Sequence, residues 1–314
     1  MPRALVTGAA GFVGACLVRR LLQEGHEVHV LLRPEQEWRL VEVQEDIVRH
    51  QADLEDQQQV ARCVRLARPQ WIFHLATYGA YSQQVDRERI YRTNVLGVVN
   101  LVTAARSAGV EVMVNTGSSS EYGFKDHAPA EGEVPEPNSD YAVSKTSATM
   151  FCQHTARKEG WRIPTLRLYS VYGPYEEPTR FIPRLVVAGL KGQLPPLVDG
   201  SVARDFVFVE DVCDAYVAAA RAGGEDLGPV FNVGSGQQTT IAEAVSVARD
   251  LFKIAEEPKW DSFAKRSWDT STWISDPTRI GKALGWRAKV GLREGLHRTA
   301  DWLRRTPCRG RYEN

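Results

Sequence analysis

The sequence predicts an α/β protein with a doubly wound parallel sheet and a smaller, irregular α/β lobe towards the C-terminus. Short apolar runs alternate with helical stretches through the first half of the chain. The run 71–76 is apolar at nearly every position, as expected for a strand covered on both faces. After Tyr172 the alternation stops, because prolines follow at 174, 178, 183, 195 and 196. Alternating strands and helices favour a parallel sheet with right-handed crossovers.

The individual elements follow from apolar patterning and from glycine and proline stops. The predicted strands are 4–7, 27–32, 47–48, 71–76, 110–114, 165–169, 206–209 and 230–233. The predicted helices are 12–24, 55–68, 85–108 and 141–158. The first helix ends at Gly25 and the second ends before Pro69, which are common helix stops. The strands at 206–209 and 230–233 are expected to return to the main sheet.

Composition and charge exclude several classes of protein. The 314 residues include 39 basic and 39 acidic side chains, so the basic footprint of a nucleic-acid-binding protein is missing. The apolar runs fall short of the roughly 18 residues of a membrane span, and no secretory leader is expected before the first strand. The five cysteines lack the C-x-x-C spacing of metal or redox sites. They favour reduced thiols, and so a cytoplasmic protein.

A glycine-rich turn joins the first strand to the first helix, in the segment Thr7-Gly-Ala-Ala-Gly-Phe-Val-Gly. Gly8 permits a tight turn, Gly11 allows a pyrophosphate to approach the backbone, and Gly14 lets the helix pack close to the sheet. The free N–H groups and the positive end of the helix then face the phosphates. The position of the turn after a strand indicates a Rossmann-type dinucleotide site. A glycine turn without a ligand is the alternative.

The end of the second strand bears on the choice of dinucleotide. An Asp or Glu there binds the ribose 2′-hydroxyl of NAD, whereas an arginine accommodates the 2′-phosphate of NADP. This chain has Arg33 and no carboxylate at that place. The sequence therefore favours NADP(H) over NAD(H), with a solvated loop charge as the alternative. Asp53, after the third strand, either reaches the adenine amino group or caps the helix that follows.

A second constellation combines a tyrosine, a lysine and a serine-rich strand end. Tyr141 and Lys145 are four residues apart on a predicted helix, so they share one face. A nearby ammonium lowers the pKa of a phenol from about 10, and a tyrosine tuned in this way exchanges a proton with an alcohol as hydride moves. The strand 110–114 leads into Ser118 at the sheet edge where ligands bind. Together with the glycine turn, these residues predict a dehydrogenase or reductase site.

These motifs resemble those of the extended short-chain dehydrogenase/reductase family, in its nucleotide-sugar epimerase/dehydratase branch. Further matching segments lie at 53–54, 74–76, 94–97, 118–123, 171–174, 204–212, 231–236 and 284–286. The resemblance covers nearly the whole chain. It implies a dinucleotide-binding domain at 1–173 plus about 205–234. It also implies a lobe that binds a nucleotide-diphosphate sugar, at about 174–204 plus 235–314.

The resemblance implies residue roles as well. Tyr141 is the catalytic acid/base, Lys145 lowers its pKa, and Ser118 hydrogen-bonds the reacting sugar oxygen. The implied cofactor-binding residues are Gly8, Gly11, Phe12, Val13, Gly14, Arg33, Asp53, Leu54, Leu75, Ala76, Tyr141, Lys145 and Val171. The candidate substrate-binding residues are Tyr78, Ser119, Ser120, Ser170, Arg180, Arg204 and Arg266. A homodimer through the helices 85–108 and 141–158 is implied, and no metal site is expected.

Three reactions share this scaffold: reduction of a 4-keto nucleotide sugar, 4-epimerisation and 4,6-dehydration. Dehydratases of the family usually carry an Asp-Glu pair directly after the catalytic residue. This chain has Ser119 and Ser120 there, and Glu121 is one residue out of register. Serine is a poor acid and a poor base for elimination. The epimerases often show an acidic residue after the second strand, where this chain has Arg33.

The sequence therefore favours a ketoreductase that uses NADPH, and a 4-epimerase with recycled NAD is the first alternative. A 4,6-dehydratase is the second alternative. An NADP(H)-binding sensor or scaffold without activity is the non-enzyme alternative. The presence of the tyrosine, the lysine and the serine counts against that last possibility, because such proteins typically lose active-site residues.

Overall fold

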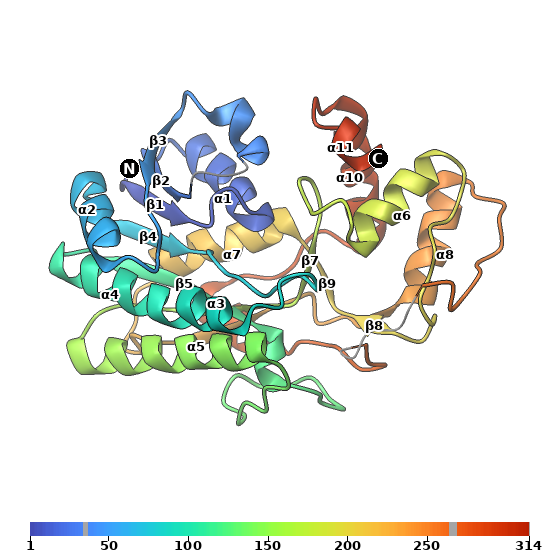
Figure 1. The fold of residues 1–314 in the computed structure, drawn as a ribbon. Helices are drawn as coiled ribbons and strands as arrows, with labels where there is room; N and C mark the ends of the chain where they lie inside the picture. The colour runs from blue at the N-terminus through green and yellow to red at the C-terminus, as the bar shows by residue number, and fades with distance from the viewer. Residues whose placement is uncertain (34–36, 264–268, 314) are drawn as a thin grey trace.

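The computed structural model describes residues 1–33, 37–263 and 269–313 (Figure 1). Their centre is a seven-stranded parallel sheet with the order β10-β6-β5-β4-β1-β2-β3. The strands are β1 (Ala4–Thr7), β2 (Val28–Leu32), β3 (Ile47–Gln51), β4 (Trp71–His74), β5 (Val112–Ser118), β6 (Thr165–Leu168) and β10 (Val230–Val233). Because the strand order reverses between β1 and β4, the sheet is doubly wound, and the predicted fold class is confirmed.

Helices cover both faces of this sheet (Figure 1). On one face α1 and α7 pack against each other, and residues of both join one apolar core. Residues of α2, α4 and α5 join a second core on the other face. The helices of the two layers are α1 (Phe12–Gln23), α7 (Val209–Arg221), α2 (Gln57–Ala67), α4 (Gly97–Ser107) and α5 (Asp140–Glu159).

A second lobe follows the sheet and holds a third apolar core (Figure 1, right). Its helices are α6 (Phe181–Leu190), α8 (Ile241–Phe252), α10 (Leu292–Arg305) and α11 (Gly310–Glu313). A two-stranded sheet of β8 (Ala203–Arg204) and β11 (Thr239–Thr240) adjoins them. In contrast, Ile280 of α9 (Thr278–Leu284) packs on the first core, beside the sheet. The lobe boundaries stated above stay a prediction.

The segment 206–209 corrects one prediction, because it does not return to the main sheet. β9 (Phe206–Phe208) pairs in parallel with β7 (Ser170–Tyr172) in a separate two-stranded sheet. Val209 already begins α7, and that helix carries two carboxylates in its first turn, a favourable place for negative charge. The strand at 230–233 does join the main sheet, beside β6, as predicted.

The helix predicted over 85–108 is present with an irregular middle. It consists of α3 (Arg87–Tyr91), a π-helical turn η2 (Arg92–Leu96) and α4. Such turns are rare, occur mostly as single turns within α-helices, and are frequent at functional sites. Here Asn94 is 2% exposed whereas Leu96 is 54% exposed. Two 3-10 turns, η1 (Trp38–Val43) and η3 (Ser119–Tyr122), were not predicted.

Two absences concern membranes and metals. None of the described helices is both long and apolar enough to cross a membrane. Nor do the described residues bring three or more His, Cys, Asp or Glu side chains into a group that could hold a metal ion.

We expect Gly14→Ala to destabilise the protein. A Cβ at Gly14 would lie 2.2 Å from the Gly8 carbonyl oxygen, so α1 must move away from β1, and overpacking of this kind costs about 1–3 kcal/mol. Gly281→Ala in α9 is the matched control, because its Cβ would meet only the Trp286 carbonyl oxygen at 3.6 Å. Urea unfolding should give a lower free energy of unfolding for Gly14→Ala alone. Equal stability of the two variants would contradict this account of the turn.

Candidate active site

Three residues predicted to be catalytic lie together at the carboxyl end of the sheet. Ser118 is the last residue of β5, and Tyr141 and Lys145 lie on the first two turns of α5. Ser139 fixes the start of α5, since its hydroxyl accepts a hydrogen bond from the Ala142 N–H at 3.2 Å. The Ser118 hydroxyl accepts the Ser120 N–H at 3.1 Å, and it lies close enough to Tyr141 to lower the pKa of that phenol. A phenol and a serine hydroxyl placed together in this way can exchange a proton with a substrate oxygen and hydrogen-bond it.

Some neighbours of Tyr141 raise the pKa of its phenol and others lower it. Burial raises the pKa of the phenol. Hydrogen bonds from Ser118 and Thr77 and the charge of Arg180 favour the phenolate, whereas the charge of Glu121 disfavours it. Without further positive charge the tyrosine is therefore a poor base near neutral pH. A cation bound beside it would make it a better one.

Lys145 is the nearest built-in cation on the same helix. It is 3% exposed, and burial lowers the pKa of its ammonium to about 8. The negative charge of Glu121 opposes this fall. Lys145 therefore keeps its proton at neutral pH with little margin, and it can supply positive charge to the phenol one turn away.

The glycine turn has the geometry of a phosphate cradle. Gly8 has a φ of +69°, and a Cβ there would lie 2.5 Å from the Ala76 nitrogen. The Gly11 N–H donates to the Gly8 carbonyl oxygen at 2.9 Å. Gly11 also caps α1 without a side chain, so the first N–H groups, around Phe12 and Val13, are free to bind an anion. These residues fit the pyrophosphate of a dinucleotide.

The other predicted cofactor residues follow strands of the main sheet or lie on the separate strand β7. Leu75 and Ala76 directly follow β4, and Val171 lies on β7. Leu54 is buried behind β3, and Arg33 is exposed at the end of β2.

Asp53 corrects one alternative of the sequence analysis. It does not cap the following helix, because the Asp56 side chain accepts the Gln58 and Gln59 N–H groups at the start of α2. One oxygen of Asp53 accepts the Glu55 N–H at 3.0 Å in a local turn. A role towards an adenine amino group stays a prediction.

The candidate substrate residues are distributed over both lobes. Arg180 is the N-cap residue of α6, and its charge acts on Tyr141. Ser170 begins β7. The Arg204 guanidinium on β8 pairs with Asp269 at 2.6 Å. Ser119 and Ser120, which are predicted to contact the substrate, lie in η3. Arg266 lies outside the residues that the structure describes.

Asn94 of the π-helical turn η2 forms hydrogen bonds to Tyr78 and to Thr77 beside it. The Tyr78 ring lies 4.6 Å from the Arg89 guanidinium of α3, in line with packing on its own lobe. The Asn94 side chain accepts the Tyr78 N–H at 2.8 Å and donates to the Tyr78 carbonyl oxygen at 2.8 Å. It also donates to Ser144 at 2.9 Å and accepts from Thr77 at 3.2 Å. Asn94 thereby fixes Thr77 beside Tyr141, a role that its sequence motif did not reveal.

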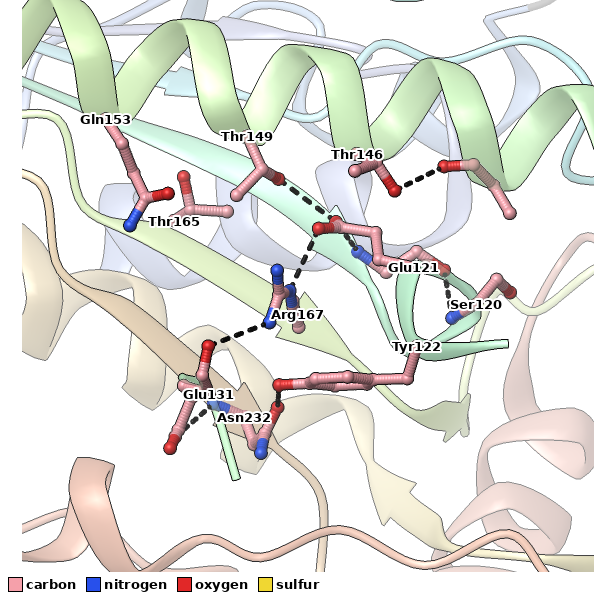
Figure 2. Close-up of polar contacts among 12 residues, drawn as sticks. Ser120, Glu121, Tyr122, Glu131, Thr146, Thr149, Gln153, Thr165, Arg167 and Asn232 are labelled. Carbon is pink, nitrogen blue, oxygen red and sulfur yellow. Dashed lines mark hydrogen bonds and ion pairs between the residues drawn. The ribbon is translucent and has the colours of Figure 1, made fainter. Parts of the chain in front are cut away.

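The Glu121 side chain points away from Ser120 and into the core, towards Thr149 and Arg167 (Figure 2). It is fully buried and pairs with Arg167 of β6 at 2.9 Å. The sequence places Glu121 one residue out of register with the acidic residue of the dehydratases. In the structure its carboxylate pairs with Arg167.

Comparison with known proteins gives the following similarities. Residues 4–234 match the model of the NAD dependent epimerase/dehydratase family. The chain is 34% identical to a UDP-glucose 4-epimerase of Mycolicibacterium smegmatis, over 96% of this chain and 98% of the relative. It is 29% identical to a dTDP-glucose 4,6-dehydratase of Streptomyces antibioticus, over 96% and 92%. A Thermus thermophilus UDP-glucose 4-epimerase solved with NAD superimposes with a TM-score of 0.85 at 30% identity, covering 97% and 99%.

We expect His74 to make the protein less stable in acid. Its ring bonds the Thr7 hydroxyl at 2.7 Å, and burial, with the charge of Lys145, lowers its pKa from 6.5 to about 3. Between these pH values the unfolded chain binds a proton that the folded chain does not. The free energy of unfolding therefore falls as pH falls, by up to about 1.4 kcal/mol per pH unit.

His74→Gln should flatten this slope in urea titrations between pH 6.5 and 4. The exposed His154→Gln is the control and should keep the parental slope. Parallel slopes for His74→Gln and the parent would refute the assignment.

Proposed function

The chain belongs to the NAD-dependent epimerase/dehydratase family, and within it we propose a nucleotide-sugar 4-epimerase that works with bound NAD. The similarity over nearly its whole length to a UDP-glucose 4-epimerase carries this proposal. It replaces the ketoreductase that the sequence alone favours. The substrate is then a nucleoside diphosphate linked to a hexose, with the reaction at C4.

The residues divide the work between proton transfer and binding. A nicotinamide held beside Tyr141 and Lys145 would supply reversible hydride exchange at the sugar C4, so that hydride can be removed from one face of the ring and restored on the other. Tyr141 takes the proton of the C4 hydroxyl and later returns it, while Ser118 hydrogen-bonds the same oxygen. Lys145 favours the phenolate. Arg180 and Arg204 suit the diphosphate, because a guanidinium binds phosphate oxygens in pairs.

The orientation of Glu121 supports an epimerase over a dehydratase. Elimination of water needs a base for the C5 proton and an acid for the leaving hydroxyl. The two residues after Ser118 are serines, and the carboxylate of Glu121 is buried in its pair with Arg167. A 4-epimerase needs neither group, because its proton returns to the oxygen from which it came.

We propose NAD(H) as the cofactor, in place of the NADP(H) that Arg33 favours. A similar epimerase was solved with NAD. Arg33 is exposed at the end of β2, as the solvated-charge alternative requires. A recycled cofactor also has to stay bound between the two hydride transfers, so it should survive purification.

We expect the purified protein to interconvert C4 epimers of a nucleotide sugar without added reductant. The test is incubation with UDP-glucose and related sugar nucleotides, followed by chromatography of the products and of the cofactor released by denaturation. Tyr141→Phe should lower kcat by roughly 10²–10⁴-fold, because it removes the acid/base group. Stoichiometric consumption of NADPH would instead identify a reductase. A product that has lost water would identify a dehydratase.

We also propose a homodimer through α4 and α5, which lie side by side (Figure 1). Met150 on α5 is 61% exposed. Leu96, just before α4, is 54% exposed. Large apolar side chains at exposed positions on adjacent helices favour burial against a second copy.

Met150→Glu should weaken this dimer, because it places a charge in an apolar contact. We expect the dissociation constant in sedimentation velocity to rise at least tenfold, which is about 1.4 kcal/mol. Val134→Glu, at a position 75% exposed on a loop, is the matched control and should leave the dissociation constant unchanged. A monomeric parent protein would refute the proposal.

A further inference from the structure

We propose that Glu121 is a positioning residue of the active site, which fixes the backbone of Ser118 and places a buried negative charge beside Lys145 and Tyr141. The inference rests on the proposed function and deepens it. It concerns a residue that touches neither substrate nor cofactor and acts through its neighbours.

The Glu121 carboxylate is held from three elements (Figure 2). One oxygen accepts the Ser118 N–H of β5 at 2.8 Å and the Thr149 hydroxyl of α5 at 3.1 Å. The other accepts the Arg167 Nε–H of β6 at 2.9 Å. The carboxylate therefore joins the strand end that carries the reacting serine to the helix that carries the tyrosine and the lysine.

The bond to Thr149 fixes where the charge lies. Thr149 follows Lys145 by four residues, so both side chains project from one face of α5. Gly117 leaves room for the carboxylate, because a Cβ there would lie 2.7 Å from the nearer Glu121 oxygen. Glu121 and Ser118 also form a capping box around η3. Neither the backbone nor the charge can shift independently of the other.

Among the described residues, the titratable groups next to Lys145 and Tyr141 are mostly neutral. His74 of β4 is neutral, since its pKa lies at about 3. Burial raises the pKa of Cys152 on α5 to about 12, and it raises the pKa of Tyr216 on α7 well above its usual value. Glu121 supplies a negative charge that acts on both members of the catalytic pair, Arg180 supplies a positive charge that acts on Tyr141, and Arg167 lies behind Glu121 as its ion-pair partner.

The partner of Glu121 is itself fixed on its far side. The Arg167 guanidinium donates to the Glu131 carbonyl oxygen at 3.3 Å and lies 4.5 Å from the Tyr122 ring. The Tyr122 hydroxyl donates to the Asn232 side chain of β10 at 2.7 Å. A chain of polar contacts thus anchors the pair across β6 and β10 (Figure 2).

The test is the pH profile of kcat for Glu121→Gln, which keeps the shape of the side chain and removes its charge. Without this charge both Lys145 and Tyr141 give up their protons more easily. We expect both limbs of the profile to move to lower pH by roughly half to one unit. Displacement of Ser118 should also lower kcat roughly tenfold or more with little change in KM.

Two further variants make the result decisive. Glu121→Gln leaves Arg167 unpaired and can fail to fold, so Glu121→Gln/Arg167→Gln, which removes both charges, tests the same shift and should show it with a smaller size. Glu131→Gln is the matched control from the same polar network, and its profile should coincide with that of the parent. A lower kcat without a shifted profile in the folded variants would overturn the proposal and leave a purely structural role.

A substrate-free measurement separates this inference from the proposed function. The near-ultraviolet absorbance of phenolate, compared between each holoenzyme and its Tyr141→Phe counterpart, reports the ionisation of Tyr141 alone. Glu121→Gln should lower the pH at which this signal appears, and Glu131→Gln should leave it in place. If the parent shows no epimerisation and this shift is still observed, the proposed function fails and the inference about Glu121 stands. An unshifted signal in Glu121→Gln overturns the inference.

Discussion

The parallel pairing of β1, β4 and β5 is the constraint on which the site depends. Thr7 pairs with His74, and His74 pairs with Asn115, so these strands run in step to one edge of the sheet. The glycine turn, the Leu75-Ala76 segment and the serine-rich strand end then follow at that edge. An antiparallel partner anywhere in this set would separate the phosphate cradle from the acid/base residues, because alternate strand ends would point to opposite edges.

The sheet, the glycine turn and the tyrosine–lysine pair could be predicted from sequence because each is a local signal. Apolar runs mark buried strands, and spacing of four residues marks one helix face. The partner of Glu121 could not be predicted in this way, since Arg167 is 46 residues away and adjacency depends on the order of β5 and β6. The prediction that 206–209 joins the main sheet was wrong for a similar reason, because strand order is a property of the whole sheet.

The π-helical turn and the inward carboxylate show a further limit of sequence patterning. The run around Val95–Val102 is apolar nearly all round, and this pattern conceals one extra residue in a turn. Asn94 lies in this turn, is buried, and bonds the loop that carries Thr77. Likewise, a glutamate after three serines is ambiguous until the space at Gly117 and the neighbouring strand are known. Both features bear on the surroundings of Tyr141, through Thr77 and through the charge of Glu121.

The close approach at Gly117 also restricts how this site can change during evolution. A Cβ at this position would lie 2.7 Å from the Glu121 carboxylate, 2.9 Å from Thr165 Cγ2 and 3.0 Å from Arg167 Cγ, so substitutions at residue 117 depend on these neighbours. A lineage that replaces the glycine first displaces the carboxylate and leaves the Arg167 guanidinium buried without its partner. A lineage that first shortens the Glu121 and Arg167 side chains removes two of the three close contacts before residue 117 is enlarged. The order in which these residues can be substituted is therefore set by the space beside Gly117, which is too small for one methyl group.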